Sequence, residues 1–317
     1  MPDNLVFAGT PGFALASLRA LVRAGMAPVL VLTQPDRPAG RGRKLSQSPV
    51  KQYAAEQGIA VSQPEDLRQS PTLAALAALR PVAIVVAAYG LIFPPELLAM
   101  PARGCINVHA SLLPKYRGAA PVQYAIWCGE DETGITIFQI EPKLDAGPIL
   151  AVERTPIGPR ETSGELEERL AAIAAPLVRR VVAQIAAGTT EPQTQDAARV
   201  TKAPRLRKEQ GAIDWTKSPL EIDCHIRAMQ PWPTAYTFLP AVAGHRARLI
   251  VLEVAPLGDP IGEAGTIAEA SQRLVVHCGG GAVEVVRLKP EGKREMGAAE
   301  FLHGHTLRPG NCLNSQG

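Results

Sequence analysis

Short, wholly apolar runs alternate with helix-like segments in the first half of the chain, and this alternation strongly limits the possible folds. In a parallel sheet, helices cover both faces, so both sides of each strand are buried. Such strands are apolar throughout and do not alternate between polar and apolar residues. The first domain is therefore predicted to be α/β and Rossmann-like, with a mainly parallel sheet. The apolar runs lie at 5–8, 28–33 and 82–87, and the helix-like segments at 13–24, 49–58, 72–80 and 166–187.

The pattern changes after Gly188. Residues 188–208 are polar, include Pro192 and Pro204, and show no periodicity, which is typical of a linker. A helix-like segment follows, and then short strand-like runs with turn residues between them, a spacing that indicates a small, OB-like β-barrel. We predict a catalytic domain over 1–188, a basic linker over 189–208 and a barrel domain over 209–317. The helix is expected at 219–229 and the strands at 234–239, 247–255, 265–270, 273–277 and 282–288.

Three polar residues stand among apolar strand-like residues between Cys105 and Ile149. Asn107 and His109 are two positions apart, so on a strand their side chains point to the same face. Asp145 follows a second strand-like run at 135–140. A long polar turn after a buried strand is where open α/β sheets place ligands. An amide, an imidazole and a carboxylate at such a place suit acyl transfer, although a lone Asn or His at a strand end is more often structural than catalytic.

Composition restricts the class of protein. The chain has 317 residues, of which 46% are hydrophobic and 20% charged, as in a soluble globular protein. It shows no apolar run of about 18 residues, and its N-terminus lacks a basic signal region, so no membrane contact and a cytoplasmic location are expected. The five cysteines are dispersed, which indicates reduced thiols. We expect no metal, because His303 and His305 have no cysteine partner at metal spacing. We also expect a monomer.

Positive charge is concentrated in two stretches, although the net charge is only +3. Such stretches favour contact with a polyanion, and the alternative is that they are solvated loops. Asp36 is the single acid in the first stretch, and the second has none. The basic residues are Arg37, Arg41, Arg43, Lys44 and Lys51 in the first stretch, and Arg199, Lys202, Arg205, Arg207 and Lys208 in the second.

A turn of sequence Gly-Thr-Pro-Gly at 9–12 follows the first strand, where a dinucleotide-binding fingerprint would lie. It is not G-x-G-x-x-G, and no acidic residue ends the second strand, so a nicotinamide cofactor is disfavoured. The turn is either a backbone site for an anion or a simple strand-to-helix connection.

The motif N-V-H-A-S-L-L-P-K-Y-R-G-A-A-P at 107–121, with L-D-A-G-P-I-L at 144–150, resembles the folate-dependent formyltransferases. The resemblance covers nearly the whole chain. It is closest to the branch that formylates methionyl initiator tRNA, because 33–51 is similar to the inserted basic loop of that branch. Residues 208–215 and 226–236 are similar to the start of its second, barrel-like domain.

The resemblance implies 10-formyltetrahydrofolate as formyl donor, methionyl initiator tRNA as acceptor, and no metal. It also implies roles for individual residues, with Arg41 meeting the acceptor end of the tRNA. The implied catalytic residues are Asn107, His109 and Asp145. The implied folate-binding residues are Tyr89, Gly90, Leu91, Ile92, Ser111, Leu112, Leu113 and Pro114. The implied tRNA-binding residues are Arg37, Arg41, Arg43, Lys44, Lys202, Arg205, Arg207 and Lys208.

The chemistry agrees with these roles. An amine attacking the formyl carbon generates an oxyanion, which the Asn107 amide and an N–H of His109 can stabilise. Asp145 beside His109 would favour the imidazolium form and orient a water that shuttles protons. Other formyltransferases, acting on amino sugars or glycinamide ribonucleotide, and a formyl-folate hydrolase are alternatives within the superfamily. A nucleic-acid-binding protein without catalysis is an alternative from another class.

Overall fold

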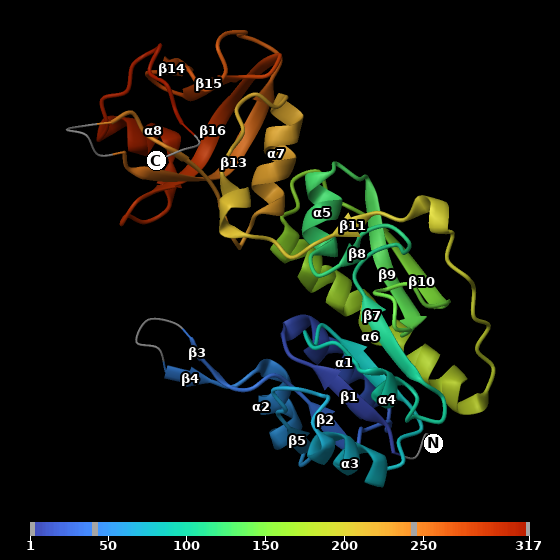
Figure 1. Ribbon diagram of the computed structural model, residues 1–317. Coiled ribbons are helices and arrows are strands. Elements are labelled where there is room, and N and C mark those ends of the chain that lie inside the picture. Colours follow the sequence, from blue (N-terminus) through green and yellow to red (C-terminus); the bar gives the residue numbers. More distant parts are fainter. Residues whose placement is uncertain (1–3, 40–43, 242–245, 315–317) are drawn as a thin grey trace. The chain divides into compact units, whose positions relative to one another are not determined.

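The computed structural model describes residues 4–39, 44–241 and 246–314, which form two compact units (Figure 1). Each unit is assembled from more than one stretch of chain, and the second unit includes two short pieces that precede its main stretch. Unit 1 comprises Met1–Pro121, Glu132–Pro156 and Glu167–Ala203, and unit 2 comprises Val122–Asp131, Ile157–Leu166 and Pro204–Gly317.

Unit 1 contains a seven-stranded, mainly parallel sheet in the order β10-β9-β7-β6-β1-β2-β5. The pairs β1–β2, β2–β5, β1–β6 and β6–β7 are parallel, whereas β7–β9 and β9–β10 are antiparallel. The predicted Rossmann-like parallel sheet is therefore confirmed, with an antiparallel edge added. The strands are β1 (Val6–Gly9), β2 (Leu30–Leu32), β5 (Ala60–Ser62), β6 (Ile84–Ala87), β7 (Cys105–His109), β9 (Glu132–Gln139) and β10 (Ile149–Pro156).

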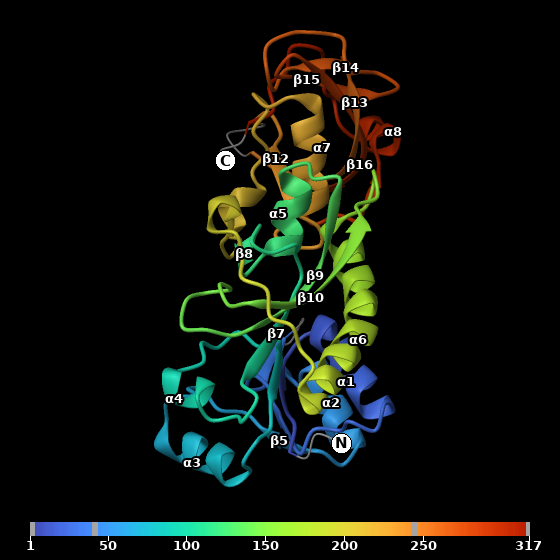
Figure 2. The ribbon, with the colours of Figure 1, turned by 90° about the vertical axis from the view of Figure 1, so that its right-hand side faces the viewer.

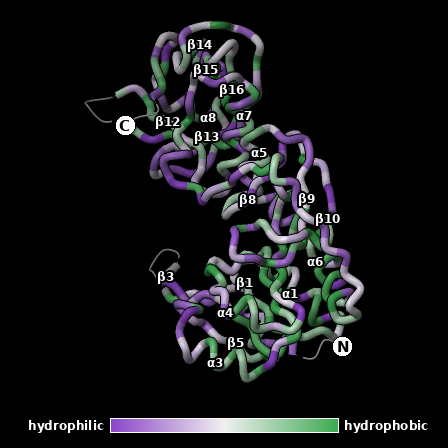
Figure 3. The backbone as a smooth tube through the Cα atoms, turned by 45° about the vertical axis from the view of Figure 1, so that its right-hand side comes forward, coloured by the Kyte–Doolittle hydropathy of each residue, from purple (hydrophilic) through white to green (hydrophobic). Residues whose placement is uncertain are grey.

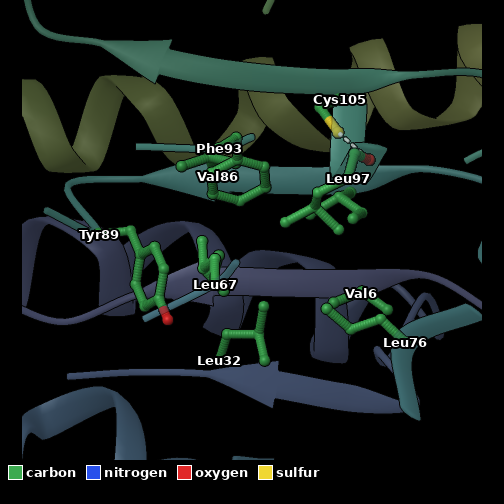
Figure 4. Packing of buried hydrophobic residues seen from close by; sticks show 11 residues of the cluster. Val6, Leu32, Leu67, Leu76, Val86, Tyr89, Phe93, Leu97 and Cys105 are labelled. Atoms are coloured by element: carbon green, nitrogen blue, oxygen red, sulfur yellow. Dashed lines mark hydrogen bonds between the residues drawn. The ribbon is translucent and has the colours of Figure 1, made fainter. Parts of the chain in front are cut away.

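Helices cover both faces of this sheet, as the continuous apolar runs predicted. Figure 2 shows α3 and α4 on one side and α1, α2 and α6 on the other. Val6 and Val86 of adjacent strands pack against Leu76 of α3 and Leu97 of α4 in one buried cluster (Figure 4). The helices are α1 (Gly12–Arg23), α2 (Pro49–Glu56), α3 (Ser70–Ala78), α4 (Pro95–Leu98) and α6 (Ser163–Ala187).

By length and composition α6 could cross a membrane, and it is the one helix among the described residues with that property. Its apolar side chains Leu170, Val178 and Val181 are buried within unit 1. Figure 3 shows hydrophobic residues concentrated along α1 and α6. A buried core helix of a soluble protein can have the same length and composition as a membrane span. The helix α6 is therefore only weak evidence that the chain crosses a membrane.

Unit 2 is built on an antiparallel sheet in the order β12-β13-β16-β15-β14, with β17 paired to β16. The predicted strand-like runs all correspond to strands, and the predicted helix at 219–229 corresponds to α7. The N-cap Ser218 and Glu221 form a capping box that defines the start of α7. The elements are α7 (Pro219–Ala228), β12 (Ala235–Phe238), β13 (Arg248–Leu257), β14 (Ile267–Ala270), β15 (Leu274–Cys278), β16 (Gly281–Pro290), β17 (Met296–Gly297) and α8 (Ala298–His303).

The two edges of this sheet are joined by the segment that follows α8. The Phe238 N–H donates to the Asn314 carbonyl at 2.8 Å, and the Asn314 N–H donates back at 3.1 Å. The Leu313 N–H donates to the Gly265 carbonyl beside β14 at 2.8 Å. The terminal segment therefore closes the antiparallel unit in the manner of the predicted barrel, and this role of residues 313–314 was not evident from the sequence pattern.

Two segments expected to lack regular structure contain short strands. The basic loop forms a hairpin of β3 (Arg37–Ala39) and β4 (Lys44–Ser46), and the polar linker contributes β11 (Lys202–Ala203). β11 pairs in parallel with β8 (Arg117–Gly118) in unit 1. α5 (Pro121–Trp127) follows β8. The expected linker is therefore attached to the unit that contains the candidate catalytic residues.

Candidate active site

Asn107 and His109 lie near the carboxyl end of β7, on the same face of the strand, as predicted. In the register with β9, Asn107 is opposite Phe138 and His109 is opposite Thr136. His109 is 5% exposed, whereas Asn107 is half-buried. The imidazole is therefore held inside the protein and the amide lies closer to solvent.

The two ring nitrogens of His109 have different surroundings. Nε2 lies 3.0 Å from the Tyr116 carbonyl oxygen, and Nδ1 lies 4.0 Å from Oδ2 of Asp145. A carbonyl oxygen only accepts hydrogen bonds, so Nε2 carries the proton of the neutral ring. Nδ1 is then the nitrogen that gains or loses a proton, and it faces the carboxylate.

Burial lowers the pKa of His109 below its ordinary value, although the Asp145 carboxylate and the Tyr116 carbonyl both act to raise it. The expectation that Asp145 would favour the imidazolium thus describes one contribution, and burial outweighs it. A neutral imidazole accepts a proton during a reaction more readily than an imidazolium does.

Asp145 reaches His109 by a route that the sequence argument did not anticipate. β9 runs antiparallel to β7, so its last residue Gln139 is opposite Ile106, at the far end of β7 from His109. The loop between β9 and β10 brings Asp145 back to the imidazole. Asp145 adopts a φ of +48°, and its Oδ2 accepts the Gly118 N–H at 2.8 Å. The three candidate catalytic residues are thus assembled in unit 1.

The expected folate-binding turn is rigidly held. The Ser111 hydroxyl donates to the Lys115 carbonyl at 2.7 Å. The Thr136 hydroxyl donates to the Ser111 carbonyl at 2.6 Å and accepts the Leu113 N–H at 3.1 Å. Ser111, Leu113 and Pro114 are buried, and Leu112 is half-buried.

The second expected folate-binding segment, which follows β6, divides into buried and exposed residues. The Tyr89 ring packs edge-on against Phe93 with centroids 6.2 Å apart, inside the core cluster of Figure 4. Burial raises the pKa of its hydroxyl. Gly90 is exposed and Leu91 half-buried, whereas Ile92 is 88% exposed. The side chain available to a ligand here is therefore Ile92 rather than Tyr89.

Strands β6 and β7 are parallel neighbours, so the segments after their carboxyl ends lie at the same edge of the sheet. Leu144, beside Asp145, is 66% exposed. Ile92 and Leu144 are large apolar side chains on loops, a type of group that could contact the ring of an aromatic ligand.

The expected tRNA-binding residues are divided between the two units. Arg37 is exposed on β3 and Lys44 begins β4, whereas Arg41 and Arg43 lie outside the described residues. Lys202 is exposed on β11 of unit 1. In unit 2, the exposed basic residues of the set are Arg205, Arg207 and Lys208.

Lys51, counted in the first basic stretch, is half-buried and paired with Asp36. Its Nζ lies 2.6 Å from Oδ2 of Asp36, and the Gln63 amide donates to Oδ1 at 2.8 Å. These bonds hold the pKa of the Asp36 carboxyl below its usual value. Lys51 therefore stabilises the base of the hairpin. Across the part of the chain that is described, no group of three or more His, Cys, Asp or Glu residues could hold a metal.

Sequence reasoning missed Gln195, which links Asp145 to Arg117. Its side-chain amide donates to the carbonyls of Asp145 and Gly147 at 2.9 and 2.8 Å, and its oxygen accepts from Arg117 Nη2 at 2.6 Å. A glutamine in a polar segment without periodicity gives no local signal of such a role.

The chain belongs to the formyl transferase family. Residues 4–182 match the family described as "Formyl transferase", and residues 205–306 match "Formyl transferase, C-terminal domain". The fold and these two matches define an enzyme that transfers a formyl group. Asn107, His109 and Asp145 stay its predicted catalytic residues.

Two curated relatives are each named methionyl-tRNA formyltransferase. The protein of Methylococcus capsulatus is 44% identical over 304 residues, covering 96% of this chain and 97% of the relative. The protein of Stutzerimonas stutzeri is 46% identical over 303 residues, covering 95% of each.

Among solved structures, WlaRD, a sugar 3N-formyl transferase crystallised with dTDP and 5-N-formyl-THF, is similar in fold, with a TM-score of 0.65. It is 16% identical, and the match covers 93% of this chain and 100% of that one. At this identity the likeness concerns the fold alone.

Proposed function

We propose that this enzyme transfers a formyl group from 10-formyltetrahydrofolate to the α-amine of methionyl initiator tRNA. The observation that carries the proposal is the 44–46% identity to proteins named methionyl-tRNA formyltransferase over at least 95% of both chains. The site in unit 1 supports it, because the Asp145 carboxylate faces the His109 imidazole and Asn107 lies two residues from His109 on β7.

The reaction requires one bond to form and one to break. The neutral amine attacks the formyl carbon, an oxyanion develops on the formyl oxygen, and the bond from carbon to N10 of the folate then breaks. The amine loses a proton and N10 gains one. The half-buried Asn107 amide is suited to donate to the oxyanion, and the loss of one such donor typically costs ~10²–10³ in rate.

His109 is suited to the proton transfers. Its Nε2 is occupied by the Tyr116 carbonyl, so proton exchange takes place at Nδ1, beside Asp145. Burial keeps the ring neutral and ready to accept the amine proton, and the nearby carboxylate stabilises the imidazolium that forms. The same proton can then pass to N10, directly or through a water oriented by Asp145.

The folate is expected at the edge formed by residues 89–92 and 111–114. The exposed Ile92 and Leu144 would contact the apolar faces of the pterin, while the hydrogen-bonded turn at Ser111–Pro114 supplies fixed backbone groups. Soaking crystals with a folate analogue tests this placement. Density at another site, with this edge empty, would contradict it.

The tRNA is expected to bind through Arg37, Arg41, Arg43 and Lys44, and through Lys202, Arg205, Arg207 and Lys208. On this proposal residues 1–188 are catalytic, 189–208 link the domains and 209–317 hold the tRNA. The proposal includes a cytoplasmic location, because translation takes place there. It also includes a monomeric enzyme that does not bind membranes.

A transfer assay with labelled formyl donor tests the proposal. The acceptors are aminoacylated initiator tRNA, aminoacylated elongator tRNA and a nucleotide-linked amino sugar. We expect label in the initiator tRNA, with less in the elongator. Label in the sugar alone would instead make the protein a sugar formyltransferase.

A further inference from the structure

We infer that Gln195 is a positioning residue, which holds the Asp145 loop so that the carboxylate faces Nδ1 of His109. The inference rests on the proposed function for the role of Asp145, and it adds a residue to which neither the family resemblance nor the relatives' names assign a role. Gln195 is 50 positions from Asp145 in the chain and is 8% exposed.

The chemistry of its partners requires an amide at this position. The NH₂ group donates to two carbonyl oxygens, of Asp145 and Gly147, which can only accept. The amide oxygen accepts from Nε and Nη2 of Arg117, at 3.2 and 2.6 Å, and a guanidinium can only donate. Rotating the amide by half a turn would place like groups against each other on both sides. Glutamate would lose both donors, and methionine would lose donors and acceptor alike.

The Asp145 loop needs such support. Asp145 is not glycine, yet its φ is +48°, a conformation that costs of order 1–3 kcal/mol and persists only when its surroundings hold it. The Gly118 N–H holds the Asp145 carboxylate at 2.8 Å. Gln195 holds the backbone of the same residue. Side chain and main chain are thus restrained from different segments, a requirement for precise catalytic geometry.

Gln195 is itself fixed by the segment that contains it. Gln193 exchanges backbone hydrogen bonds with Ile149 of β10, at 2.7 and 2.8 Å. Further along, the Thr201 hydroxyl accepts the Tyr116 N–H at 2.8 Å, and β11 pairs with β8. The polar segment between these attachments is therefore held beside the loop that carries Asp145 and is not a free connection.

Gln195→Met tests the inference, because it keeps the length of the side chain and adds no charge. Gln193→Met is the matched control, since Gln193 lies two positions away with an exposed side chain. The first measurement is the pKa of His109 by NMR in the enzyme without substrates. The groups facing the imidazole are the Asp145 carboxylate, the Tyr116 carbonyl and the edge-on Phe138 ring.

In Gln195→Met the backbone of Asp145 loses the hydrogen bond that holds it, so the carboxylate should move away from Nδ1 and the pKa of His109 should fall below that of the wild type. It should stay unchanged in Gln193→Met. An unchanged pKa of His109 in folded Gln195→Met overturns the inference. The pKa of His109 is measured without tRNA. Its result therefore tests the role of Gln195 independently of whether tRNA is the substrate.

The second measurement is a double-mutant cycle in formyl transfer. Gln195→Met should lower kcat by on the order of 10- to 10²-fold, as small misplacements of catalytic groups do. In an Asp145→Asn background the same substitution should change kcat less than twofold, because the group it positions is already lost. Equal losses in both backgrounds would mean a purely structural residue. If Gln195→Met does not fold, Gln195→Asn takes its place in both measurements, since it retains the amide but shortens its reach.

Discussion

The surroundings of Asp145 and the basic stretches differ in how firmly their side chains are held. His109 and Asp145 are restrained by groups from several segments, through Tyr116, Gly118 and Gln195. The basic side chains at Arg37, Lys202 and Arg205 are exposed. The difference follows from the tasks: proton transfer requires fixed geometry, whereas attraction of a polyanion requires charge at the surface.

The same difference is seen within the first basic stretch. Lys51 is a lysine like its neighbour Lys44 in the sequence, but its side chain is bonded to Asp36 and stabilises the base of the hairpin. Positive charge in the sequence therefore does not by itself identify residues available to a nucleic acid.

The largest effects on turnover are expected for the three candidate catalytic residues. Asn107→Ala, His109→Ala and Asp145→Ala should each lower turnover by about 10²-fold or more, through loss of an oxyanion donor or a proton-transfer group. The affinity for tRNA should stay nearly the same, because none of the three lies in a basic stretch. Turnover and filter binding measure the two quantities, and wild-type turnover in any variant would remove that residue from the mechanism.

Gly118→Ala should damage both stability and turnover. The φ of Gly118 is +129°, and an added Cβ would lie 2.4 Å from the Ala203 carbonyl oxygen. We expect a loss of roughly 1–3 kcal/mol in the free energy of unfolding, with lower kcat because the N–H bond to Asp145 is disturbed. Gly12→Ala is the control, since no atom lies within 4 Å of its added Cβ. Equal denaturation midpoints for the two variants would contradict this account.

Arg41→Ala tests whether one basic residue does more than supply charge. If Arg41 reads the acceptor end, the substitution should lower kcat/KM for initiator tRNA by roughly 10-fold or more, as loss of a base contact does. Arg43→Ala and Lys44→Ala should have smaller effects. The Arg41 effect should also shrink on tRNAs with an altered first base pair. Equal losses in all three variants, following salt concentration, would leave Arg41 with a charge role only.

The smallest expected effect is on the free energy of unfolding at acid pH. Burial lowers the pKa of His109 and of His225, below the ordinary value of 6.5. As pH falls through 6.5 the unfolded chain therefore takes up protons before the folded protein does, so stability is present above that pH and is lost below it. Each histidine contributes a slope of at most ~1.4 kcal/mol per pH unit. His225→Gln should flatten the decline below about pH 6.5. Urea unfolding at several pH values measures the slope.

Local pattern was sufficient to predict much of this protein. The apolar runs predicted β1, β2 and β6, and the two-residue spacing predicted that Asn107 and His109 share a face. The strand-like runs after Thr234 predicted the antiparallel unit. These features depend on side-chain periodicity and burial, which are properties of neighbouring residues in the chain. The motif at 107–121 predicted the family through its resemblance to the folate-dependent formyltransferases.

Other features were decided only by the tertiary structure. Because β9 runs antiparallel to β7, its carboxyl end lies away from His109. The loop that follows β9 brings Asp145 back to within 4.0 Å of Nδ1. Gln195 became a partner of that loop because the polar segment attaches to β8 and β10. The lowered pKa of His109 arises from burial by the assembled fold. Each of these depends on contacts between residues far apart in sequence, and such contacts exist only once the chain has closed its loops and packed its core.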